Sequence, residues 1–220
     1  MLSFLQPAIL GQVFRLVPIG HPAESGNLFP HTWKGKMKMS SLATVFEQMT
    51  FVTVLWLFYC MVVMHEFEEW NIDQIEQKHF EGVPIAATDR SARMVIAFVS
   101  MAGLIWCSIA TFSGDPTLAA WIFFPAIAFM LLNALQHIFW SFYFRKLAPG
   151  VITSALLIIP FGSFVVIRAI GQGYVPAWYA VALGVVIILG FAQTAISGSR
   201  MTALIRSGNQ IGIWLSDRIG

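Results

Sequence analysis

Charge is scarce in this sequence. Only 11% of its 220 residues are Asp, Glu, Lys or Arg, against about a quarter in a typical soluble domain. Hydrophobic residues make up 57%, and so apolar a chain is typical of an integral membrane protein. The formal net charge of +2 comes without a basic tract or stripe, which argues against a nucleic-acid partner.

Cysteine is almost as rare, with Cys60 and Cys107 as the two examples. Both lie inside apolar runs, so they form neither a metal-binding spacing nor a disulfide framework. We expect them to behave as small buried hydrophobic residues. The redox compartment is left open.

Proline, glycine and lysine concentrate at the start of the chain, so residues 1–40 are predicted to form a poorly ordered leader. The first twenty residues lack a basic start and a clear small-residue cleavage site, which does not favour a secretory signal peptide. Met37 and Met39 stand just before the first long apolar run, so a non-native start upstream of them is an alternative.

Five apolar runs follow, and they predict an all-α fold, a polytopic membrane helical bundle of about five transmembrane helices. The first helix is predicted to start at Ser40 or Ser41 and to continue without a break past residue 65. The predicted five-span domain covers residues 41–197, with later spans at about 92–112, 117–144, 150–170 and 176–196. Residues 71–91 suit an interfacial loop or short surface helix, and residues 198–220 suit an amphipathic tail on the membrane surface.

The first span ends in a polar cluster, His65-Glu66-Phe67-Glu68-Glu69. An ionisable group at membrane depth costs about 2.5–3.5 kcal/mol at a helix centre, so such groups usually mark a site. Spacings of three and four residues place His65, Glu68 and Glu69 on one helix face. Glu66 points about 100° away and is predicted to face the interface or a basic partner.

The third span carries a second polar cluster, in which Asn133 and His137 share a helix face. His137 lies about 12 Å before the polar boundary at Arg145, and His65 lies about 9 Å before Asn71. Spans one and three run in the same direction, so both clusters lie under the same membrane face. We therefore predict one pocket, lined by His65, Glu68, Glu69, Asn133 and His137.

The distribution of basic residues predicts which face this is. The side of the site carries eight Lys or Arg residues and the other side carries five, four of them in the leader. By the positive-inside bias, the site faces the cytoplasm. The predicted location is a bacterial-type cell membrane.

These residues resemble the HXXEE-domain family of small integral membrane proteins. The resemblance rests on the motif at residues 65–69, on Asn133 and His137, and on Ala148-Pro149-Gly150-Val151-Ile152-Thr153, and it covers about residues 45–170. It implies a compact helical membrane bundle and supports the pairing of the two clusters. It implies no substrate.

His65, Glu69 and His137 provide two imidazoles and one carboxylate, a set that suits zinc with an open fourth position or a non-haem iron centre. Glu68 and Asn133 are the predicted catalytic residues, Glu68 as general base or partner of a ligand and Asn133 as an orienting group. The motif is not HExxH, because Glu69 occupies the position of the second histidine. These features predict a metal-dependent membrane enzyme acting on a hydrophobic or lipid-like substrate.

Three other interpretations stay open. A desolvated Glu69 with His65 could move protons on an apolar substrate without a metal, as an isomerase does. The cluster could serve proton-linked transport or lipid binding. It could also hold helices together, although such hydrogen bonds contribute only about 0.6 kcal/mol each in membranes. Membrane lipids and a hydrophobic small molecule are the predicted partners, and the oligomeric state is left open.

Overall fold

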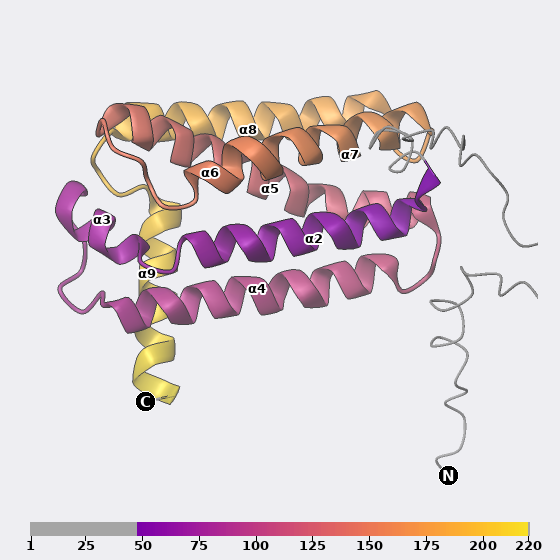
Figure 1. Ribbon diagram of the computed structural model, residues 1–220. Helices are drawn as coiled ribbons and strands as arrows, with labels where there is room; N and C mark the ends of the chain where they lie inside the picture. Colours follow the sequence, from indigo (N-terminus) through magenta and orange to yellow (C-terminus); the bar gives the residue numbers. More distant parts are fainter. Residues whose placement is uncertain (1–47, 220) are drawn as a thin grey trace, which may run out of the picture. The chain divides into compact units, whose positions relative to one another are not determined.

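The computed structural model describes residues 48–219 (Figure 1). The predicted leader, residues 1–40, and residues 41–47 lie outside the described part of the chain. Within it, five helical segments are long and apolar enough to cross a membrane: Phe51–Glu68, Asp89–Thr111, Pro116–Tyr143, Val151–Gly171 and Ala177–Ser197. The predicted all-α bundle with five spans is confirmed.

The first span, α2 (Phe51–Glu68), begins later than predicted. Thr50 adopts an extended conformation with ψ 152°, and its side chain accepts a hydrogen bond from the backbone N–H of Thr53. A threonine in this conformation is a helix N-cap, because its oxygen satisfies a backbone donor that has no partner within the helix. The predicted continuous helix from Ser40 or Ser41 is therefore wrong at Thr50.

The polar segment after α2 contains a short helix, α3 (Ile72–His79), as predicted for residues 71–91. The second span, α4 (Asp89–Thr111), starts with a capping box formed by Thr88 and Ser91. The third span, α5 (Pro116–Tyr143), starts at a proline behind the N-cap Asp115. Side-chain caps and an N-terminal proline fix where these helices begin.

Helix α5 contacts each of the other four spans, namely α2, α4, the fourth span and α8 (Ala177–Ser197). The core around it is built from fully buried apolar side chains, among them Phe58 of α2 and Phe124 of α5. On α8 the fully buried residue is Thr194, and much of the outer apolar face is exposed, including Val181, Ile188 and Ile196. In a bilayer, lipid covers such a face without a hydrophobic cost.

The fourth span is irregular near the site. It consists of α6 (Val151–Thr153), a π-helical turn η1 (Ser154–Ile158) and α7 (Ile159–Gly171). Pro160 explains the wide turn, because its ring cannot donate a backbone hydrogen bond and would clash with the carbonyl four residues earlier. The widened turn allows the segment to continue as a helix while α6 stays close to the end of α2.

The C-terminal helix α9 (Ala203–Ile219) crosses the bundle at the end where α2 and α3 meet (Figure 1). Its Gly212 allows a close approach to α4, since a Cβ there would lie 2.4 Å from the Ser91 carbonyl oxygen. The apolar side chains of Ile211 and Trp214 stay exposed. The helix thus covers the end of the bundle that carries the polar clusters.

The cysteines differ from each other. Cys107 is buried as expected, whereas Cys60 is exposed on the surface of α2. The expectation that both are buried is wrong for Cys60, because its face of α2 is left uncovered within the described bundle.

Candidate metal centre

The end of α2 places three polar side chains of the motif. His65 is fully buried, and the backbone N–H of Glu69 still bonds the His65 carbonyl oxygen at 3.2 Å. The next hydrogen bond, from Trp70 to Phe67, spans three residues and closes the helix with a tighter turn. Glu69 is therefore held one helical turn above His65, on the same face.

Glu69 brings together the two histidines that the sequence places 72 residues apart. Its Oε1 atom lies 2.8 Å from Nε2 of His65 and 2.8 Å from Nε2 of His137. The two imidazole rings meet edge to face with their centroids 5.2 Å apart. All three residues are buried. The structure thus places the three predicted metal ligands in one cluster.

Asn133 joins the same cluster from α5. Its Nδ2 lies 3.0 Å from Nε2 of His65 and donates to Oε1 of Glu69 at 3.3 Å. An amide nitrogen can only donate, so in this contact Nε2 of His65 is the acceptor. Asn133 therefore contacts His65 and Glu69 at once.

The other nitrogen of His65 leads to the same conclusion. Nδ1 of His65 lies 2.8 Å from the hydroxyl of Thr153, and that hydroxyl donates to Oε2 of Glu68 at 2.6 Å. Because Thr153 has a single hydroxyl proton and uses it for Glu68, Nδ1 of His65 must donate. The contacts with Thr153 and Glu68 thus place a proton on Nδ1 of His65 and leave Nε2 as the ring nitrogen that faces Asn133 and Glu69.

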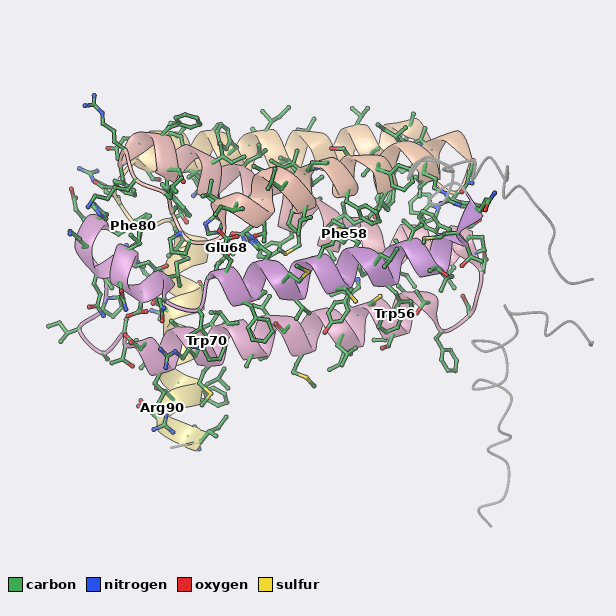
Figure 2. The ribbon with its side chains drawn as sticks, in the orientation of Figure 1. Trp56, Phe58, Glu68, Trp70, Phe80 and Arg90 are labelled. Atoms are coloured by element: carbon green, nitrogen blue, oxygen red, sulfur yellow. The ribbon has the colours of Figure 1, made fainter. Side chains whose placement is uncertain are left out.

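Glu68 lies beside the cluster and does not contact the two histidine Nε2 atoms. Its carboxylate accepts from the backbone N–H groups of Ile152 at 3.1 Å and Thr153 at 2.8 Å, at the start of α6. Figure 2 shows Glu68 at the end of α2, facing the segment above it. Through the hydroxyl of Thr153, Glu68 is linked to Nδ1 of His65, an arrangement by which a carboxylate orients a histidine.

A glycine closes the cluster from the side of α6. Gly150 has φ +85°, and a Cβ built on it would lie 2.9 Å from Cε1 of His65 and 3.0 Å from Oε1 of Glu69. A positive φ is readily adopted by glycine and rarely by other residues. The position therefore needs glycine for its backbone and for the space that His65 and Glu69 occupy.

A cavity of about 160 Å³ lies next to the cluster, enclosed by α2, α3, α4, α5 and α9. Glu69, Asn133 and His137 form part of its wall, and so does Glu66. Glu66 is only 5% exposed, so its predicted place at the interface is wrong. It lies about 100° from His65 as expected, but it faces the cavity that α4 and α9 help to enclose.

Glu76 of α3 is a second cavity residue that the sequence did not single out. Its Oε2 accepts from Nδ2 of Asn209 on α9 at 3.1 Å. Burial raises the pKa of Glu76 to about 7, against the hydrogen bond from Asn209. The sequence gives no sign that Glu76 is buried, because α3 is a short polar helix. The cavity that Glu76 and Ile72 line is closed by α9, which lies far away in the sequence.

The cluster fits a divalent transition metal. Among residues 48–219, His65, Glu69 and His137 are the one group whose ligand atoms lie within 4.8 Å of one another. The buried Nε2 of His137 has no hydrogen-bond partner among the described residues, although Glu69 is near. Two ring nitrogens and one carboxylate oxygen therefore converge, and a shared cation would be bound by them. Zinc and iron are both compatible with this donor set.

Fold and site together define a polytopic helical membrane protein with a buried His/Glu/His cluster below one end of its bundle. The chain belongs to the family described as "Protein of unknown function with HXXEE motif", which it matches over residues 56–165. The resemblance to that family, drawn over residues 45–170, is confirmed.

A protein of Bacillus subtilis (strain 168), described as "Uncharacterized protein YrkK", is similar to this chain. The two are 26% identical over 117 residues, which cover 50% of this chain and 70% of the relative. No solved structure matches the chain.

Proposed function

We propose that the protein is an integral membrane enzyme that holds a divalent transition metal, zinc or iron, and acts on a hydrophobic or lipid-like substrate. One observation carries the proposal: the Nε2 atoms of His65 and His137 both lie 2.8 Å from the same oxygen of Glu69. The three residues are the proposed ligands, and the metal when bound would supply a Lewis acid to a polar group of the substrate.

The surrounding residues would hold the side chains of the proposed ligands in place. Thr153 and Glu68 keep the proton of His65 on Nδ1, which leaves Nε2 free to bind. Asn133 restrains both His65 and Glu69. Partners of this kind typically change metal affinity by about 10–100-fold when they are removed.

The substrate would enter the cavity next to Glu69. Its wall combines the three acidic side chains with apolar residues of α4, α5 and α9, and its position within the bundle favours a molecule that dissolves in lipid. A cavity that adjoins a cluster of titratable groups is the default position for a substrate site.

The test is the metal content of the full-length protein purified in detergent, measured by elemental analysis. We expect about one zinc or iron per chain, and a loss of metal in His65→Ala and His137→Ala. A variant of the exposed Glu81, Glu81→Gln, serves as control and should keep the metal. Wild-type protein free of transition metal after growth in zinc- and iron-supplemented medium would contradict the proposal.

A second candidate is favoured by the hydrogen-bonded row from Glu68 through Thr153 to His65. Such a row could pass a proton to Glu69, so a metal-free acid-base reaction of the isomerase type is the alternative. The metal analysis separates the two, because this chemistry needs Glu69 and His65 but no ion.

We also propose that the site faces the cytoplasm of a bacterial-type cell. In residues 48–219 eight of nine Lys and Arg side chains belong to segments at the site end, and Arg168 belongs to the other end. The positive-inside bias then places the site end inside. A green fluorescent protein fused after α9 should fluoresce in cells, whereas an alkaline phosphatase fused there should be inactive.

A further inference from the structure

The cavity beside the cluster is rich in acceptors and contains no Lys or Arg. Glu66, Glu69 and Glu76 contribute carboxylates to its wall. His137 is the one basic side chain there, and it already contacts Glu69. A buried carboxylate without a partner is unfavourable, because its desolvation is not compensated.

Glu66 carries this imbalance most clearly. Its side chain lines the cavity and is only 5% exposed. Within residues 48–219 its carboxylate makes no hydrogen bond or ion pair, and it belongs to no group of metal ligands. Glu69 is engaged by two histidines, and Glu76 by Asn209. Glu66 is therefore the acceptor that is available to a ligand.

The residues that line the cavity change from polar to apolar along the bundle. Glu76 and Asn209 lie at the end covered by α9, while Val99 and Phe129 lie further along α4 and α5. Phe129 precedes the end of α5 by about 21 Å of helix, which places it at the depth of the hydrocarbon core. It is 44% exposed, so the cavity reaches a surface that lipid covers.

The carboxylates do not form a second metal centre. Among the described residues, Glu66 and Glu76 belong to no group of three ligands with atoms within 4.8 Å. A cation that binds there is therefore expected to be an organic cation large enough to fill the cavity, and not a bare metal ion. The cavity of about 160 Å³ compares with an engineered apolar cavity of about 150 Å³ that holds benzene, so an apolar group of about six carbons fits.

We infer that the cavity binds a lipophilic amine, which enters from the bilayer beside Phe129 and places its ammonium group against Glu66. This inference rests on the proposed function for the role of the neighbouring cluster and specifies its substrate class. The ammonium supplies the donors that Glu66 lacks, and the chain of the amine packs against Val95, Val99 and Phe129. A neutral alcohol of the same length cannot neutralise the carboxylate.

The test is calorimetric titration of the full-length protein in detergent with n-hexylamine, 1-hexanol and hexanoate at about pH 9.5, where a carboxyl group is readily ionised and a primary amine, with a pKa of about 10.4, still carries its proton. The protein is first treated with chelator, so that the amine cannot bind through a metal. We expect hexylamine to bind at least ten-fold more tightly than hexanol, and hexanoate not to bind. Equal binding of amine and alcohol would overturn the inference.

Two variants localise the binding. Glu66→Gln keeps the shape of the side chain and should reduce hexylamine affinity at least ten-fold, whereas Glu81→Gln should leave it unchanged. Unchanged hexylamine binding in folded Glu66→Gln would also overturn the inference. If Glu66→Gln fails to fold, the selectivity of the wild type for amine over alcohol decides. Because the titration uses chelated protein, its result is independent of the metal analysis.

Discussion

Thr153 binds Glu68 twice, with its backbone N–H 2.8 Å and its hydroxyl 2.6 Å from the same carboxylate oxygen. The hydroxyl also faces Nδ1 of His65 at 2.8 Å. A segment from the fourth span thereby fixes both the helix end and the tautomer of a proposed ligand.

Removal of that hydroxyl should weaken metal binding. Thr153→Val keeps the shape but leaves Nδ1 of His65 without its partner, so we expect zinc affinity to fall by about 10–100-fold in a competition titration with a chromogenic chelator. Thr153→Ser retains the hydroxyl and is the matched control. Equal zinc affinities for the Val and Ser variants would show that Thr153 has no such role.

The sequence predicted which polar residues come together better than it predicted what surrounds them. Helical spacing and depth counted from polar boundaries were sufficient to bring His65 and His137 together, because both helices are regular between the site and the membrane face. The same spacing located Glu66 correctly on α2 but gave the wrong environment. Its burial goes with a cavity that α4 and α9 help to enclose, a long-range arrangement without a local signal.

Local chemistry also explains the other differences. Thr50 caps α2, although no glycine or proline marks this helix start. The role of Thr153 follows from its position at the start of α6, next to a π-helical turn that the sequence shows only through Pro160. Side-chain caps and wide turns depend on hydrogen bonds that hydropathy does not report.

A glycine pair separates backbone strain from crowding at the site. Gly150 and Gly82 have nearly the same φ, +85° and +81°, but a Cβ on Gly82 would meet nothing within 4 Å. An alanine at either position should cost roughly 1–3 kcal/mol of strain. Gly150→Ala additionally displaces His65 and Glu69, so it should melt lower than Gly82→Ala and lose zinc affinity.

The measurement is thermal unfolding in detergent, followed by the same zinc titration for both variants. For a chain of this size 1 kcal/mol corresponds to about 2–4 °C in melting temperature. Equal melting temperatures and equal zinc affinities for the two alanine variants would mean that Gly150 is required for its backbone alone.

Asp73 should make stability depend on pH. Burial and the neighbouring carboxyl group of Asp89 raise the pKa of Asp73 to about 6, from its ordinary value of 3.8. The folded state then binds more protons than the unfolded state between these two values, so stability falls as pH rises through this window. We expect a higher melting temperature at pH 4.5 than at pH 7.5.

The substitution Asp73→Asn removes the titrating group and should flatten this dependence, mainly by raising the melting temperature at pH 7.5. Asp217→Asn, at an exposed position of α9, is the control and should keep the wild-type slope. An undiminished slope in Asp73→Asn would assign the pH dependence to other groups.

Glu69 distinguishes a functional site from a set of hydrogen bonds that merely joins helices. It is buried beside two histidines, and no Lys or Arg of the described residues forms an ion pair with it. A carboxylate retained for function costs stability, because its desolvation is only partly offset. In metal-free protein we therefore expect Glu69→Leu to melt no lower than wild type.

A bound metal would hide this gain, since it stabilises the folded state by mass action. The comparison therefore uses chelator-treated wild type, Glu69→Leu and Glu69→Gln in the same detergent, with Glu69→Gln as the variant that keeps size and a polar partner for Asn133. If the residue serves only to join helices, the Leu variant should melt several degrees lower while the Gln variant melts like wild type. Zinc added back should raise the melting temperature of wild type and leave that of Glu69→Leu unchanged, because the Leu variant lacks the oxygen that both histidines approach.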